Sequence, residues 1–134
     1  MKNIIFLVSI AILLFSCSGT PSGTNKTGNA VNDNLFTVAK EINKKCPIIT
    51  DENTRMDSAT VFNEYMITYH YTIHTINNKD VDITKFKNSL QTTMNEKYKT
   101  DPQLAIYRDN KIAIAYDYKD KNAGFLCYFI CEIK

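Results

Sequence analysis

Residues 65–76 read YMITYHYTIHTI, and this stretch decides the fold because large and small side chains alternate along it. Successive residues of a strand point to opposite faces of a sheet. One face therefore receives the bulky side chains of Tyr65, Ile67, Tyr69, Tyr71 and Ile73. The other face receives Met66, Thr68, His70, Thr72 and His74. We predict a strand whose odd-numbered face is buried.

The segments before this strand supply a helix and a hairpin partner. Apolar residues recur at helical spacing over residues 31–46, and Cys46-Pro47 ends that helix. A short extended piece follows at residues 48–50. Residues 55–61 then alternate as a second strand, and we expect the two strands to form a hairpin closed around residues 62–64.

The segments after the strand complete an α+β domain. Residues 83–99 carry an apolar helical stripe, with Asp82 as its N-cap. We expect three further strands, at residues 103–108, 111–118 and 125–133. The last should be central in the sheet, because residues 125–130 are apolar on both faces. The order α-β-β-α-β-β-β predicts an antiparallel sheet of about five strands with two helices packed on one face.

The first 17 residues have the features of an export signal. One positive charge precedes a 12-residue apolar run, IIFLVSIAILLF. A membrane-spanning helix needs about 20 such residues, whereas a signal peptide needs about 7 to 15. The run ends in Leu14-Phe15-Ser16-Cys17, which resembles a bacterial lipobox, with a small residue before the cysteine and an aliphatic one three before it. An ordinary secretory signal with an incidental cysteine is the alternative.

The lipobox resemblance implies that cleavage follows Ser16 and that the Cys17 sulfur carries a lipid. Two or more acyl chains anchor a protein stably on a membrane without spanning it. Ser18 follows the cysteine where the enterobacterial inner-membrane signal has Asp. The resemblance therefore implies a lipid-anchored protein of the bacterial cell envelope, sorted to the outer membrane.

The chain divides into three parts by composition. Residues 1–16 are the signal peptide, and residues 17–34 are the lipidated cysteine and a Gly, Ser, Thr and Asn-rich tether. Residues 35–134 form a single α+β domain. Removal of residues 1–16 takes away Lys2 and changes the formal net charge from +2 to +1. A nearly neutral chain without a basic cluster is not expected to bind nucleic acid.

The histidines and cysteines do not predict a metal or cofactor site. His70 and His74 are the only histidines, and four positions along a strand put their Cα atoms about 13 Å apart. Zinc holds imidazole nitrogens at about 2 Å, so the pair is badly spaced for one ion. For an exported protein, the sequence is compatible with a disulfide from Cys46 to Cys127 or Cys131, and buried free thiols are the alternative.

The densest polar stretch is CPIITDENTRMD, residues 46–57. Its Arg55 can bind Asp51, Asp57 or the carboxylate of a ligand through two parallel hydrogen bonds. We therefore take Asp51, Arg55 and Asp57 as the candidate surface for a ligand or partner. The alternative is that Asp51 caps a turn while Arg55 and Asp57 pair on the surface.

This stretch belongs to a wider pattern of short motifs. The pattern CP-x-x-x-D-x-x-T-R-x-D is followed by Tyr69-x-Tyr71, Arg108-Asp109-Asn110 and YDYKDKN at residues 116–122. Together they resemble small exported bacterial proteins of unassigned function. The resemblance implies a shared fold and surface and brings no activity with it. Those proteins usually have glycine directly after Lys-Asn, where this chain has Ala123, so its last turn is expected to differ.

Two classes of function remain. We favour a binding or interaction module in the envelope that engages an envelope protein or a small ligand, because tyrosine-rich surfaces give contact area at low entropic cost. The alternative is an envelope enzyme that uses Arg55, Asp57 and a histidine. No phosphate loop, nucleotide fingerprint or Ser-His-Asp order supports catalysis, so we do not expect an enzyme.

Overall fold

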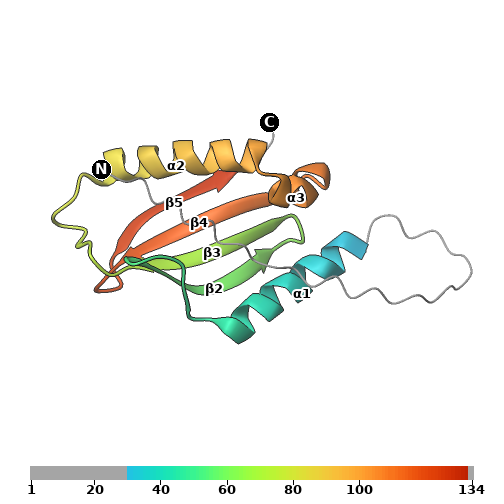
Figure 1. The fold of residues 1–134 in the computed structure, drawn as a ribbon, viewed down its shortest axis with the longest axis horizontal. Helices are drawn as coiled ribbons and strands as arrows, with labels where there is room; N and C mark the ends of the chain where they lie inside the picture. The colour runs from blue at the N-terminus through green and yellow to red at the C-terminus, as the bar shows by residue number, and fades with distance from the viewer. Residues whose placement is uncertain (1–29, 133–134) are drawn as a thin grey trace, which may run out of the picture.

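The structure, a computed structural model, describes residues 30–132, with side chains from residue 34 onward (Figure 1). Its elements in chain order are α1 (Ala30–Lys45), β1 (Ile48–Ile49), β2 (Thr54–Phe62), β3 (Met66–Ile73), α2 (Ile83–Thr100), the 3₁₀ turn η1 (Pro102–Leu104), α3 (Ala105–Asp109), β4 (Ala113–Asp120) and β5 (Phe125–Cys131). The signal peptide, Cys17 and most of the expected tether lie outside the described residues. Helix α1 already begins at Ala30, so its first turn falls within residues assigned to the tether by composition.

The strands form one five-stranded sheet in the order β1-β2-β3-β4-β5. This confirms an α+β domain with about five strands. The antiparallel prediction is wrong at one pair, because β3 and β4 run parallel, and the sheet is mixed. Antiparallel strands can follow a tight turn, but parallel neighbours need a crossover of a dozen or more residues. Helix α2 provides that crossover between β3 and β4.

Two strand assignments made from the sequence differ in the structure. Residues 103–108, expected as a strand, belong to η1 and α3, because Asp101 accepts a hydrogen bond from the Gln103 N–H and Pro102 opens a helical turn. The fifth strand is instead the two-residue β1, which pairs with β2. Strand β5 lies at an edge of the sheet rather than in its centre.

One face of the sheet packs against the helices and forms the core. The predicted odd-numbered face of β3 is on this side, with Ile67 fully buried and Ile73 7% exposed. Helix α1 packs over β2 and helix α2 over β5, and residues of both helices belong to a single hydrophobic core. Tyr71 and Tyr118 stack at 5.1 Å between ring centroids, and Tyr116 stacks on Phe129 at 5.4 Å. We call this side of the sheet the core face.

Specific hydrogen bonds fix both helices to the sheet. The Asn43 side chain of α1 accepts from the backbone N–H of Ala59 at 2.7 Å and donates to its carbonyl at 2.8 Å, so it substitutes for a neighbouring strand at the edge of β2. Asp82 caps α2 as predicted, accepting from the Lys85 N–H at 3.1 Å. At the other end of α2, Tyr98 donates to the Ile112 carbonyl at 2.7 Å, and burial raises its pKa.

A buried carboxylate organises the turn between β4 and β5. Asp120 is 1% exposed and accepts hydrogen bonds from the backbone N–H groups of Asn78, Asn122 and Gly124. These hydrogen bonds hold the pKa of Asp120 below its ordinary value. The bond from Asn78 has the largest effect, followed by those from Gly124 and Asn122. A Cβ on Gly124 would lie 2.9 Å from the Asn78 side-chain nitrogen and 3.0 Å from both Asp120 oxygens, so a larger residue would displace these groups.

The same turn contains Ala123, at the position where the sequence resemblance led us to expect glycine. Ala123 has φ of 64°, in the left-handed region that favours glycine. The backbone at residue 123 therefore has a conformation that glycine adopts more readily than alanine.

Candidate functional site

The opposite side of the sheet, which we call the open face, carries Arg55, Asp57 and His70 among the polar residues singled out in the sequence. The register places Arg55 opposite Thr72, and Thr72 beside Lys119. It places Ser58 opposite His70, and His70 beside Asp117. These residues alternate with the buried side chains of the core face, so they share the other side of the strands.

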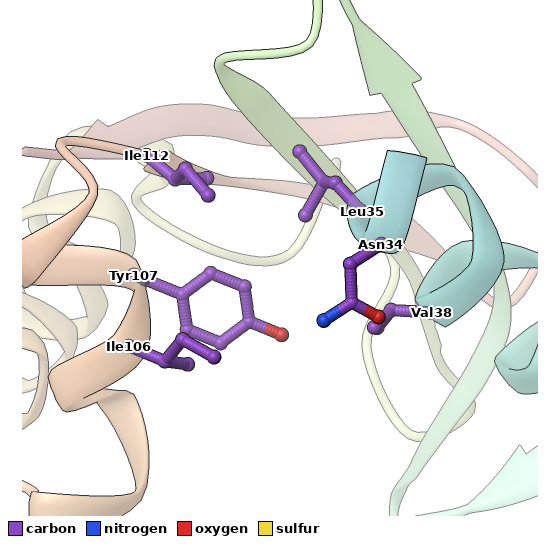
Figure 2. Close-up of a pocket in the computed structure, with 6 residues that line it drawn as sticks. All are labelled: Asn34, Leu35, Val38, Ile106, Tyr107 and Ile112. Atoms are coloured by element: carbon purple, nitrogen blue, oxygen red, sulfur yellow. The ribbon is translucent and has the colours of Figure 1, made fainter. Parts of the chain in front are cut away.

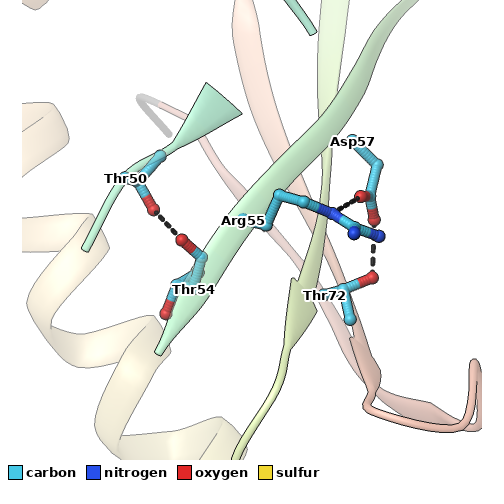
Figure 3. A network of polar contacts seen from close by, with 5 residues as sticks. All are labelled: Thr50, Thr54, Arg55, Asp57 and Thr72. Atoms are coloured by element: carbon cyan, nitrogen blue, oxygen red, sulfur yellow. Dashed lines mark hydrogen bonds and ion pairs between the residues drawn. The ribbon is translucent and has the colours of Figure 1, made fainter. Parts of the chain in front are cut away.

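Arg55, Asp57 and Thr72 form a hydrogen-bonded group that we call the polar cluster (Figure 3). The register of β2 and β3 shifts between Met56 and Ser58. In this bulge Asp57 has no residue opposite it in β3, and its side chain lies beside Arg55. The Arg55 Nε donates to Asp57 Oδ1 at 2.6 Å, and the Thr72 hydroxyl donates to Asp57 Oδ2 at 2.6 Å. Both carboxylate oxygens are thereby engaged, and the guanidinium is held in one orientation.

Asp51 does not join the polar cluster. Its carboxylate accepts from the backbone N–H of Asn53 at 2.9 Å within its own turn. The Thr50 hydroxyl bonds the Thr54 carbonyl across the same turn (Figure 3). Asp51 is therefore a turn-stabilising residue in the structure, while the predicted pairing of Arg55 with Asp57 is present.

His70 lies in a second polar group on the open face, with Thr60 and Asp117. His70 Nδ1 is 2.9 Å from Asp117 Oδ2, and His70 Nε2 is 2.9 Å from the Thr60 hydroxyl. His74 lies beyond the end of β3 and is exposed. Among the described residues, no group of three or more His, Cys, Asp or Glu side chains is placed to hold a metal ion.

Sequence reasoning missed Thr60, Thr72 and Asp117 as members of these groups. Asp117 is 47 positions from His70, and the two meet only because β3 and β4 are parallel and in this register. The available signal was their placement on the side of each predicted strand opposite the bulky residues. That signal gives the face but not the partner.

Apolar side chains cover another part of the open face. The Tyr128 hydroxyl lies 3.9 Å from the Met66 sulfur, although β4 separates their strands. Met66 pairs with Ala113 and Tyr128 pairs with Asp117, so Ala115 lies midway between the two pairing positions on β4, and it is fully buried. The small residues of β4 therefore make room for the Tyr128 ring, which covers this part of the sheet.

A small pocket lies away from both polar groups, between α1 and α3 (Figure 2). The Asn34 amide and the Tyr107 hydroxyl point toward one another across it, and the apolar side chains of Leu35, Val38, Ile106 and Ile112 form the rest of its lining. Its enclosed volume is about 30 Å³. Sites for small organic ligands usually measure about 300 to 1,000 Å³, so this pocket is small for that purpose.

All three cysteines of the described part, Cys46, Cys127 and Cys131, are free, so neither disulfide left open by the sequence is present. Cys46 precedes β1 at one edge of the sheet, whereas the other two are on β5 at the opposite edge. Strands lie about 4.8 Å apart, so crossing from β1 to β5 takes about 19 Å, and a disulfide needs Cα atoms within about 7 Å. Burial raises the pKa of Cys127 and of Cys131 to about 11, so both thiols are protonated at neutral pH.

The sequence from residue 30 to residue 127 matches the model of a protein family, Domain of unknown function (DUF8479). The chain belongs to this family. A search of curated proteins finds no match in sequence. No helix within residues 30–132 is long and apolar enough to cross a membrane.

Solved structures of three bacterial proteins have the same fold. A protein from Pseudomonas aeruginosa that is inferred to be secreted matches with a TM-score of 0.62 and 13% identity, over 81% of this chain and 94% of its own. The type 2 secretion pilotin EpsS from Vibrio vulnificus matches with a TM-score of 0.60 and 11% identity, over 75% of this chain and 86% of its own. The type II secretion pilotin AspS from Vibrio cholerae matches with a TM-score of 0.56 and 8% identity, over 75% of this chain and 86% of its own. At these identities the likeness establishes a shared fold.

Proposed function

We propose that this protein is a lipid-anchored protein of the bacterial outer membrane whose folded domain binds another envelope protein. The observation that carries the proposal is the fold shared with two pilotins of type II secretion systems. Both belong to type II secretion systems, so the fold is known in proteins that are parts of a larger secretion assembly. The neighbour from Pseudomonas aeruginosa, which is inferred to be secreted, supports export.

The anchor in this proposal is the lipid on Cys17. The Leu14–Cys17 lipobox and the short apolar run before it support lipidation. Growth with radioactive palmitate should label the wild-type protein and leave Cys17→Ala unlabelled and in the soluble fraction. Equal labelling of the two proteins would rule out this anchor.

The binding surface in this proposal is the polar cluster of the open face. Within residues 30–132, Arg55 makes its one side-chain hydrogen bond through Nε, which leaves both terminal nitrogens of the guanidinium for a partner. Asp57, held in turn by Thr72, fixes the orientation of the guanidinium before binding. A pre-oriented guanidinium suits bidentate binding of a carboxylate. We therefore propose that Arg55 binds an acidic side chain of the partner.

Chemical crosslinking in intact cells, followed by isolation of the anchored protein, tests this surface. The partner crosslinked to wild type should be lost in Arg55→Ala and reduced in Arg55→Lys, which keeps the charge but not the paired donors. Lys119→Ala is the matched control, because Lys119 is an exposed cation on the same face. Equal loss with Lys119→Ala would indicate nonspecific charge attraction, and no loss with Arg55→Ala would exclude Arg55.

A second candidate function is catalysis on the same face, near Arg55 and Asp57. The observation that favours it is the order hydroxyl, imidazole and carboxylate in Thr60, His70 and Asp117. That order matches the roles of a nucleophile, a base and the group that orients the base. Hydrolysis of simple chromogenic esters, present in wild type and absent in His70→Ala, would establish this function. Equal rates in the two proteins would remove it.

A further inference from the structure

We propose that one end of the domain, the end at which α1 begins, rests on the surface of the lipid bilayer. Four large apolar side chains are exposed there by half or more: Phe36, Phe62, Tyr65 and Ile106. We call these four residues the apolar end. The proposal deepens the proposed function and rests on its lipid anchor, because it states how the anchored domain is oriented.

Independent contacts bring the four residues to one end of the sheet. Ile106 in α3 and the first half of α1 line the same pocket, which places Phe36 and Ile106 on neighbouring segments (Figure 2). The Tyr65 carbonyl accepts from the N–H of Ala113 at 2.8 Å, which places the turn between β2 and β3 beside the start of β4. In Figure 1 the start of α1, α3 and the tip of β2 lie together at the right of the molecule.

The opposite end of the sheet exposes both acidic and apolar residues. Its loops carry four exposed carboxylates, on Asp51, Glu52, Asp80 and Asp82. Two large apolar residues, Ile49 and Phe125, are also exposed near this end, 67% and 61%. Exposed carboxylates also lie at or next to the apolar end, on Glu64, Asp109 and Glu132. Surface composition alone therefore does not decide which end meets the lipid.

The position of the anchor decides which end meets the membrane. The expected tether runs from Cys17 to the start of α1 at Ala30, and a flexible chain of that length has a mean reach of about 20 Å. The tether thus enters the domain beside the apolar end. The opposite end lies about 26 Å further along the eight residues of β3. Phe and Tyr side chains lie favourably at the level of lipid headgroups.

This orientation has a consequence for binding. The polar cluster lies toward the opposite end, because Arg55 is the second residue of β2 whereas Phe62 is its last. With the apolar end on the bilayer, the terminal nitrogens of Arg55 are held away from the lipid and open to an envelope partner. The fold would then separate membrane contact from partner binding.

The absence of tryptophan from the chain permits a direct test. Full-length Phe62→Trp and Phe125→Trp proteins, lipidated in the host and purified from its membranes, are reconstituted into phosphatidylethanolamine–phosphatidylglycerol vesicles that contain brominated lipid. Phe62 and Phe125 are both 61% exposed, so they are a matched pair at opposite ends. Ile106→Trp and Ile49→Trp form a second pair.

For protein that floats with the vesicles, bromine should quench the indole of Phe62→Trp and Ile106→Trp at least about twofold more strongly than that of Phe125→Trp and Ile49→Trp. The emission of the first member of each pair should also shift to shorter wavelength. Flotation with equal or reversed quenching would overturn this orientation and leave the anchor intact. Failure of the wild-type protein to float would overturn the anchor, and with it the orientation.

Discussion

The two faces of the sheet are built from the same strands and hold their residues in different ways. On the core face, Tyr71, Tyr116, Tyr118 and Phe129 stack on one another under the helices. On the open face, polar side chains bind one another across strands, as Asp117 binds His70. The alternation of tyrosine with threonine and histidine in β3 sends each kind to its own face.

This difference implies a division of roles. Burial of aromatic and aliphatic surface supplies most of the free energy of folding. Partly exposed ion pairs supply little, because water screens them and the paired side chains lose entropy. We therefore expect changes to the core face to alter stability, and changes to the open face to alter binding.

The largest effect should come from alkaline pH, which acts on the core face as a whole. Burial raises the pKa of Tyr71 to about 12 and raises the pKa values of Tyr69, Tyr116 and Tyr118 as well. An unfolded tyrosine titrates near 10. Stability from these tyrosines is therefore complete below about pH 10 and is lost as the pH rises toward their folded pKa values. We expect cooperative unfolding above about pH 10, which circular dichroism would detect.

Absorbance of tyrosinate provides the control for this titration. It should rise together with the loss of circular dichroism, because the buried rings ionise when the core face opens. Ionisation of most tyrosines near pH 10 with the fold intact would mean that the core face is open to water.

The next largest effect should distinguish two neighbouring residues of β3. Ile67 is fully buried on the core face, so Ile67→Ala should lower the free energy of unfolding by about 3 kcal/mol. Met66 is half-buried on the open face, and Met66→Ala should cost about 1 kcal/mol. Urea unfolding with an unchanged m-value measures both. Equal losses would contradict the assignment of one dominant core face.

A smaller effect should come from the bond that closes α1 over the core face. Asn43→Ala removes both hydrogen bonds to Ala59, and we expect it to lower the free energy of unfolding by about 2 kcal/mol. Asn88→Ala, in an exposed position of α2, is a control that should cost less than about 0.5 kcal/mol. A similar small cost for Asn43→Ala would mean that packing alone holds α1 in place.

The core face could be predicted from the sequence to a large extent, because it depends on local alternation. The placement of Ile67 and Ile73 inside and the Asp82 cap needed only neighbouring residues. The parallel pairing of β3 with β4 could not be predicted in the same way. Residues 103–108 alternate like a strand, but Pro102 and the Asp101 side chain, which caps the turn, favour a helical turn there. Without that strand, α2 becomes a crossover, and the next strand runs parallel.

The open face was less predictable because its contacts join distant residues. Arg55 and Asp57 are two positions apart, and their pairing was one of the alternatives that the sequence left open. Thr72 binds Asp57 across the hairpin, and a bulge in β2 brings the two side chains together. Nothing local in the sequence marks that bulge. The candidate site was therefore located by residue type and completed only by strand register.

The smallest expected effect is the coupling of Arg55 to Asp57, and it tests the open face most directly. The side chains are 36% and 29% exposed, so the ion pair should contribute about 0.5 kcal/mol to stability. A double-mutant cycle of Arg55→Ala, Asp57→Ala and both together isolates this coupling in urea unfolding. Crosslinking to the partner should fall in both single variants, because Asp57→Ala releases the guanidinium that Arg55 presents. Strong coupling in stability with no loss of crosslinking would instead make the polar cluster a structural part of the sheet.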